Sequence, residues 1–239
     1  MAGRDQALAF ADFLAKLKSA SPQTSISGFL FLSCLRLWHV LILVVDPVLG
    51  DHSKLYVPVE MKDVYRQHYL SLADVITPNQ FEAELLTNIK LVSEMDVVRA
   101  IQSLHEEYDL PAVVITSVEL NNQSFYLYGS CKIQGKHDFF RIPLQKVQGS
   151  FTGTGDLFAA LLTGRCPSKK DQQAHWLRTA CELAVSTLFA VLQRTRQSAG
   201  SDESPRGTEL KLIQSKRDIE CPDAILFHAE TVQVASVNP

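Results

Sequence analysis

The chain has 239 residues, of which 46% are hydrophobic and 21% are charged, and its formal net charge is −3 at pH 7. This length suits one large α/β domain or two small ones with a sizeable core. No run of five like charges occurs, so composition argues against a nucleic-acid partner. We recognise no secretory signal and no C-x-x-C pair, and therefore expect five free thiols in a cytoplasmic protein: Cys34, Cys131, Cys166, Cys181 and Cys221.

The start of the chain has an unusual composition. Residues 5–18, DQALAFADFLAKLK, have the spacing of an amphipathic helix. Residues 26–45 are mostly apolar and are long enough to span a bilayer. Arg36 and His39 interrupt this run, and its last five residues, 41–45, are typical of a buried strand. We therefore expect a strand at residues 41–45 and no membrane anchor at residues 26–40.

From residue 41 onward, expected strands and helices alternate. This order predicts an α/β fold with a mostly parallel sheet and helices on its faces. The expected strands are 41–45, ADVITP (73–78), PAVVITS (111–117), an antiparallel edge pair at 125–128 and 139–142, and 224–228. The expected helices are 81–86, 93–108, 156–163, 175–195 and a short one near Ile213.

Polar residues follow three of the expected strands. Asp46 follows the first strand, Thr77 ends the second, and Thr116 and Ser117 end the third. In open parallel sheets, ligands bind at the carboxyl ends of the strands. The pattern therefore predicts a site that holds anions and a cation at this edge of the sheet.

A glycine-rich stretch, Gly153-Thr154-Gly155-Asp156, comes directly before an apolar helical run. Glycines allow backbone N–H groups to converge, and the start of a helix adds partial positive charge, so this stretch can bind an oxyanion. Asp156 could accept the proton of an attacking hydroxyl. The spacing is neither that of a P-loop nor that of a dinucleotide fingerprint. A plain tight loop with an aspartate at a helix start remains the alternative.

Asn79 and Glu82 lie three residues apart at an expected helix start, in TPNQFEAE. An amide and a carboxylate placed in this way could hold hydrated Mg²⁺. An N-cap with an acidic first turn is the simpler explanation of these two residues taken alone. Asp46 and Asp51, in DPVLGD, could likewise be ordinary turn residues.

Six segments resemble, in the same order, the pyridoxal kinase family of the ribokinase-like superfamily, and most closely its animal members. They are DPVLGD (46–51), ADVITPNQFEAELL (73–86), VVITS (113–117), GTGDLFAALL (153–162), STLFAVLQRT (186–195) and IQSKRDIE (213–220). The resemblance implies a three-layer α/β fold and ATP-dependent phosphorylation of the 5′-hydroxyl of pyridoxal, pyridoxine and pyridoxamine. It also implies ATP, Mg²⁺ and K⁺ or Na⁺ as cofactors, and a homodimer.

The resemblance begins late compared with family members, which have additional early strands that hold the pyridine ring. We therefore expect an atypical amino-terminal segment over residues 1–45, with the usual amino-terminal part missing or altered, and an ATP-binding and catalytic portion over 46–239. The alternative is a non-catalytic form that binds nucleotide or a partner subunit.

The resemblance also implies roles for individual residues that match the family's motifs. Asp156 would be the catalytic base, and Gly153, Thr154 and Gly155 would form the anion hole. Asp51 and Glu82 would bind Mg²⁺. The implied monovalent-cation ligands are Asp46, Thr77 and Thr116. The implied ATP contacts are Asp46, Asn79, Gln80, Phe81, Glu82, Thr116, Ser117, Val147, Gln148, Gly149 and Thr154.

Overall fold

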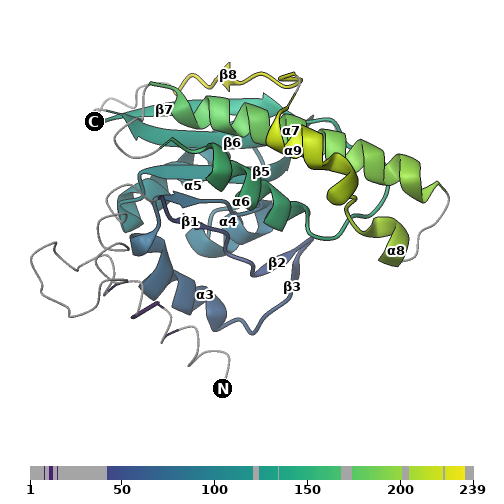
Figure 1. Ribbon diagram of the computed structural model, residues 1–239. Coiled ribbons are helices and arrows are strands. Elements are labelled where there is room, and N and C mark those ends of the chain that lie inside the picture. Colours follow the sequence, from purple (N-terminus) through teal and green to yellow (C-terminus); the bar gives the residue numbers. More distant parts are fainter. Residues whose placement is uncertain are drawn as a thin grey trace, which may run out of the picture.

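Figure 1 shows the fold as a computed structural model. The structure describes residues 42–120, 124–133, 135–167, 174–200, 205–222 and 224–234, together with residues 8, 11, 12 and 15. Nearly all of the helix expected at 5–18, and the apolar run up to residue 41, lie outside these ranges.

A six-stranded sheet runs through the middle of the molecule, with the strands in the order β1-β4-β5-β6-β7-β8. β1 pairs with β4 and β4 with β5 in parallel, and the remaining three pairings are antiparallel. The strands are β1 (Val44–Val45), β4 (Val75–Ile76), β5 (Ala112–Leu120), β6 (Ser124–Ile133), β7 (Lys136–Pro143) and β8 (Glu230–Thr231).

The α/β class is confirmed, but the sheet is mixed rather than mostly parallel. The reason lies in the connections. Only three residues separate β5 from β6, and only two separate β6 from β7. A parallel pairing needs a crossover of a dozen or more residues, so such short links force antiparallel neighbours. The antiparallel pair expected at 125–128 and 139–142 is confirmed, although β8 rather than β7 is the edge strand.

Helices cover both faces of the sheet, which gives three layers. Along β5, Val113 and Ile115 pack on one side, in a core with α4 (Gln80–Thr87) and α5 (Glu94–Tyr108). Ala112 and Val114 pack on the other side, in a core with α6 (Thr154–Arg165) and α7 (Trp176–Ala199). Successive strand residues point to opposite faces, so one apolar strand serves both cores. In Figure 1, α6 and α7 cross the near face of the sheet, and α4 and α5 lie behind it.

The four main helices occur where the sequence predicts them, with ends that differ by a few residues. α5 begins after Ser93, whose hydroxyl accepts a hydrogen bond from the backbone N–H of Asp96. Buried Val97, Ile101 and Leu104 form its apolar stripe. The sequence therefore specifies this helix through both its cap and its period.

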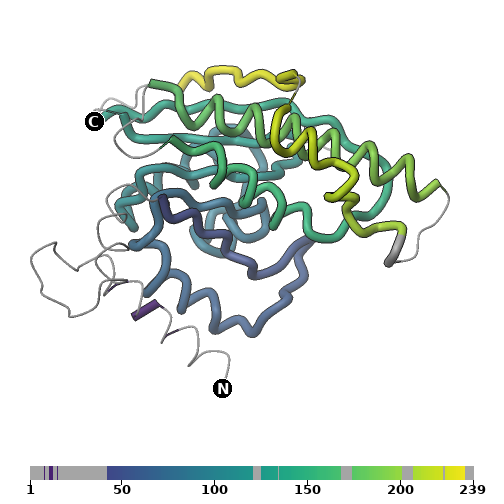
Figure 2. Tube along the Cα trace, in the orientation of Figure 1, coloured from purple at the N-terminus to yellow at the C-terminus, as the bar shows by residue number. Residues whose placement is uncertain are grey.

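Several short elements complete the fold. A small hairpin pairs β2 with β3, and a helical segment from residue 61 to residue 72 follows it. The short helix expected near Ile213 is confirmed, whereas the last strand begins after the expected 224–228 and runs beside β7 (Figure 2). The short elements are β2 (Gly50–Asp51), β3 (Lys54–Leu55), α3 (Met61–Val64), η1 (Tyr65–Tyr69), η2 (Leu70–Leu72), α8 (Pro205–Thr208), η3 (Ile213–Ser215) and α9 (Lys216–Glu220).

The described residues include four of the five cysteines, and all four carry free thiols: Cys131, Cys166, Cys181 and Cys221. Across the described ranges, no helix combines the length and apolar character required to cross a bilayer.

Candidate functional site

The carboxyl ends of β1, β4 and β5 come together at one edge of the sheet. Asp46 directly follows β1, and its Oδ1 accepts a hydrogen bond of 3.2 Å from the hydroxyl of Thr77, which directly follows β4. The backbone N–H of Thr116, within β5, donates to the carbonyl of Pro78. The pairing of β5 with β6 shifts register just after Ile115, so Thr116 and Ser117 lie at an irregularity of the strand. The structure therefore gathers the strand-end residues that the sequence singled out.

The glycine loop lies against this group. Gly153 adopts a left-handed conformation (φ 84°) as the N-cap of α6, and its carbonyl accepts from the N–H of Leu157. A Cβ on Gly155 would lie 3.5 Å from Oδ2 of Asp46, which places the first turn of α6 beside the end of β1. Asp156 is in the same turn and is exposed. An exposed carboxylate beside the positive end of a helix can accept the proton of a hydroxyl held within hydrogen-bond reach.

Negative charge accumulates at this edge. Burial raises the pKa of Asp46 to about 6. The hydrogen bond from Thr77 opposes this shift, and the charge of Asp156 adds to it. Burial also raises the pKa of Glu82 to about 7, against three backbone hydrogen bonds that lower it and with a further contribution from Asp46. Among the described residues, no lysine or arginine forms an ion pair with either carboxylate. A bound cation would relieve this repulsion.

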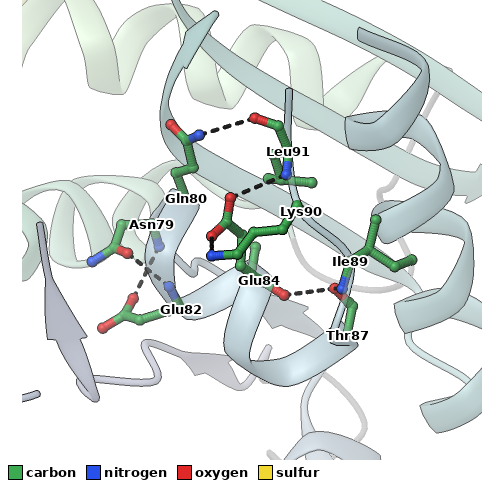
Figure 3. A network of polar contacts seen from close by, with 9 residues as sticks. Asn79, Gln80, Glu82, Glu84, Thr87, Ile89, Lys90 and Leu91 are labelled. Atoms are coloured by element: carbon green, nitrogen blue, oxygen red, sulfur yellow. Dashed lines mark hydrogen bonds and ion pairs between the residues drawn. The ribbon is translucent and has the colours of Figure 1, made fainter. Parts of the chain in front are cut away.

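Asn79 and Glu82 form a reciprocal capping box at the start of α4 (Figure 3). Asn79 Oδ1 accepts from the N–H of Glu82 at 2.9 Å, and Glu82 Oε2 accepts from the N–H of Asn79 at 2.9 Å. Glu82 Oε1 also accepts from the N–H groups of Leu49 (2.9 Å) and Gly50 (3.3 Å). Asn79 and Glu82 therefore have the capping role that the sequence left open. The bonds from Leu49 and Gly50 to Glu82 also join α4 to the loop that precedes β2 and to the start of β2 itself.

Asp51 closes β2 and is only partly buried. Its Oδ1 accepts from the N–H of His52, and its partner across the hairpin is Lys54. The described part of the chain holds no group of three or more His, Cys, Asp or Glu side chains that could enclose a metal ion. Mg²⁺ at nucleotide sites takes only one or two carboxylates beside water and phosphate oxygens, so Asp51 and Glu82 fit its chemistry.

Some residues assigned to ATP also have contacts within the protein. The side-chain amide of Gln80 donates to the carbonyl of Leu91 and accepts from the N–H of Glu119, so both of its ends are occupied. The ring of Phe81 packs beside Gly50. These contacts make Gln80 and Phe81 parts of the framework that holds the start of α4.

Val147, Gln148 and Gly149 belong to the loop between β7 and α6, where Gly149 has a φ of 124°. The same loop is tied to the carboxyl-terminal part of the chain. The N–H of Thr152 donates to the carbonyl of Thr208, and Thr152 forms a parallel bridge with Glu209.

One neighbour of the site was not predicted from the sequence. Tyr65 lies in η1, and the charges of Asp46 and Glu82 add to burial in raising the pKa of its hydroxyl. The signal was present, because Met61, Val64 and Tyr65 have the spacing of an apolar helix face.

Comparison with known proteins identifies the family. A family model described as phosphomethylpyrimidine kinase matches residues 30–194. The chain belongs to the phosphomethylpyrimidine kinase family. This family assignment agrees with the ribokinase-like resemblance of its motifs.

The curated relatives of this chain include pyridoxal kinases from several organisms. The protein from Arabidopsis thaliana is 44% identical over 183 residues, which cover 75% of this chain and 58% of the relative. The protein from Homo sapiens is 41% identical over 208 residues, covering 78% of this chain and 64% of the relative. The chain thus spans about three fifths of the length of these relatives.

Solved structures share the fold. Pyridoxal kinase from Leishmania donovani in complex with ADP and pyridoxamine has a TM-score of 0.77 at 23% identity, covering 96% of this chain and 71% of that one. The PdxK protein of Plasmodium falciparum, with AMP-PNP and PL, has a TM-score of 0.65 at 29% identity, covering 80% of this chain and 60% of that one. The three-layer ribokinase-like fold is therefore confirmed.

Proposed function

We propose that the chain is a pyridoxal kinase, which transfers the terminal phosphoryl group of ATP to the 5′-hydroxyl of pyridoxal, pyridoxine or pyridoxamine. The observation that carries this proposal is the placement of the Gly153–Asp156 turn against Asp46 at the strand-end edge of the sheet. The pyridoxal kinases that are 44% and 41% identical support the choice of substrate.

Asp156 acts as the general base in this proposal. Its carboxylate is exposed at the first turn of α6, where it can accept the proton of a hydroxyl held within hydrogen-bond reach. Gly153, Thr154 and Gly155 supply backbone N–H groups near the positive end of α6, which suits the charge that develops on a phosphoryl group in transfer. Positioning and electrostatics would supply most of the rate enhancement, as in phosphoryl transfer generally.

Two kinds of cation fit the negatively charged edge. Asp51 and Glu82 are the residues that would hold Mg²⁺, and Asp46, Thr77 and Thr116 are those that would hold K⁺ or Na⁺. When bound, these ions supply positive charge that neutralises the phosphates of ATP. The raised pKa values of Asp46 and Glu82 support a cation here. Burial is the main cause of both shifts, and the charge of Asp156 adds to the shift of Asp46, as the charge of Asp46 adds to that of Glu82.

The nucleotide would lie along the same edge. In this proposal its phosphates would contact Asn79, Thr116, Ser117 and Thr154. Its adenine would contact the loop of Val147, Gln148 and Gly149. The proposed nucleotide site also includes Asp46, Gln80, Phe81 and Glu82. Of these, Gln80 and Phe81 would contribute by holding the start of α4 in place. A homodimer in the cytoplasm is proposed from the family resemblance.

A turnover assay with purified chain, ATP, Mg²⁺ and pyridoxal tests the proposal. Formation of pyridoxal 5′-phosphate, slowed by roughly 10²- to 10⁴-fold in Asp156→Asn, is the expected result. The alternative is a non-catalytic form that binds nucleotide or a partner subunit. ATP binding by a folded chain without product formation would favour that alternative.

A further inference from the structure

Five hydrogen bonds meet at the start of α4: three tie Leu49 and Gly50 to it, and two lie within its own capping box. Glu82 accepts three of them, from the backbone N–H groups of Leu49, Gly50 and Asn79. Asn79 accepts the fourth from the N–H of Glu82 and donates the fifth, of 2.8 Å, from its side-chain amide to the carbonyl of Gly50. Residue Glu82 is 4% exposed, so water cannot substitute readily for any of these partners.

We propose that Glu82 is a positioning residue, whose carboxylate holds the loop of residues 46–51 and the β2–β3 hairpin against α4 before any metal ion binds. The consequence for turnover rests on the kinase function proposed above. The anchoring itself does not, because every contact that carries it lies within the protein.

The chemistry of the contacts requires a carboxylate at this position. Leu49, Gly50 and Asn79 present three N–H donors from two sides, and an ionised carboxylate has two acceptor oxygens and no donor. A glutamine keeps one acceptor oxygen and turns an NH₂ group toward the other side. At least one of the three donors then faces another donor, and leaving a buried donor unpaired is costly.

The anchored loop carries the two aspartates of the proposed site. Asp46 begins the loop, close to Gly155, and Asp51 follows Gly50 directly. Gly50 packs closely against its neighbours, because a Cβ there would lie 2.3 Å from the carbonyl oxygen of Lys54 and 2.9 Å from the Phe81 ring. The loop therefore lies in close contact with α4 at the point where Glu82 binds it.

Glu84 provides a matched control two residues along the same helix. Its Oε1 accepts from the N–H of Leu91 at 3.0 Å, and its other oxygen pairs with Lys90 (Figure 3). Glu84→Gln thus removes a similar carboxylate from a similar backbone contact. That contact lies on the connection from α4 to α5, outside the proposed site.

The test measures amide hydrogen exchange in Glu82→Gln and Glu84→Gln, without metal or nucleotide. We expect Glu82→Gln to speed exchange by roughly tenfold or more at Asn79, or at Leu49 and Gly50, as expected for a buried hydrogen bond that is lost. Glu84→Gln should leave these three amides at the wild-type rate and speed exchange at Leu91.

Steady-state kinetics of the same variants give the second measurement. We expect Glu82→Gln to raise KM for Mg-ATP, and excess Mg²⁺ should not restore it, whereas Glu84→Gln should leave both kcat and KM near the wild-type values. The proposal would be overturned if Glu82→Gln left exchange at Leu49, Gly50 and Asn79 unchanged and excess Mg²⁺ restored its KM. That result would show that Glu82 is only a metal ligand. A wild-type chain with no turnover would contradict the kinase function, while the exchange result would still decide the anchoring.

Discussion

Oδ2 of Asp46 lies 3.5 Å from the position that a Cβ of Gly155 would occupy, so the end of β1 and the first turn of α6 are in direct contact. This contact joins DPVLGD and GTGD, which are far apart in the chain. It also explains why the charge of Asp156, next to Gly155, contributes to the raised pKa of Asp46. The two motifs therefore lie together at one edge of the sheet.

Replacing Asp156 by asparagine tests the assignment of the general base. The variant keeps the shape of the side chain and loses the proton acceptor, so we expect turnover to fall by roughly 10²- to 10⁴-fold. ATP affinity should stay within a few fold, because the carboxylate is placed to meet the hydroxyl rather than the nucleotide. Isothermal titration with ATP and a product assay on the same preparation check both parts. Wild-type turnover in this variant would rule out the assignment.

Gly153→Ala and Gly155→Ala should differ in stability although they lie in one turn. Gly153 has a φ of 84°, and an alanine in the left-handed region costs about 1–2 kcal/mol. Gly155 is helical, and a Cβ there would make only an ordinary contact at 3.5 Å, so its replacement should change the free energy of unfolding by less than about 0.5 kcal/mol. Urea denaturation of both variants gives the comparison. Equal losses would contradict the described geometry of the turn.

The stability of the fold should fall in mild acid because of His105. This side chain is 0% exposed; its Nδ1 lies 2.6 Å from the carbonyl of Leu110, and its Nε2 lies 3.0 Å from the hydroxyl of Ser130. Burial is the main cause that lowers the pKa of His105 from 6.5 to about 4. Above pH 6.5 both the folded and the unfolded chain keep it neutral. As the pH falls from 6.5 to 4, only the unfolded chain takes up the proton, and up to about 3 kcal/mol of stability is lost.

Urea denaturation at pH 7.5 and pH 5 measures this effect in the wild type and in His105→Gln. The wild type should lose about 2 kcal/mol more than the variant over this interval, which is the part of the window above pH 5. His228→Gln is the control, because the His228 side chain is 75% exposed, and it should follow the wild type. An identical pH dependence in His105→Gln would show that His105 titrates normally in the folded chain.

Gly129→Ala should destabilise the sheet by about 1–3 kcal/mol through overpacking. A Cβ at this position, in β6, would lie 2.3 Å from the ring of Phe140 on β7, and that ring is fully buried. Gly164→Ala is the control, since a Cβ in α6 would meet nothing within 4 Å. It should be neutral or stabilising by up to about 1 kcal/mol, as alanine favours helix. Thermal unfolding followed by circular dichroism compares the two, and a stable Gly129→Ala variant would contradict the described packing of β6 on β7.

Local signals in the sequence predicted much of the fold. Ser93 and the stripe of Val97, Ile101 and Leu104 predict α5 from local residues alone. Sheet direction beyond β5 was predicted less well, because the alternation of elements favoured parallel pairing while the short links at 121–123 and 134–135 required antiparallel neighbours.

For the site, the rule that ligands lie at strand ends was enough to bring Asp46 and Thr77 together. The contacts of Glu82 with Leu49 and Gly50 could not be inferred in this way. They join residues more than thirty positions apart and depend on how the β2–β3 hairpin packs on α4, which leaves no local signature. The sequence therefore indicates that Glu82 caps α4, but it does not indicate that Glu82 also anchors the loop before β2.

The central claim is that the Gly153–Asp156 turn and the strand ends form a working phosphoryl-transfer site for pyridoxal. The most direct measurement is product formation by the purified, folded chain with Mg-ATP and pyridoxal, beside a nucleotide titration of the same sample. We predict that the chain binds ATP and forms pyridoxal 5′-phosphate, and that Asp156→Asn slows product formation by roughly 10²- to 10⁴-fold without loss of ATP binding. A folded chain that binds no ATP, or product formation at the wild-type rate in Asp156→Asn, would contradict the account.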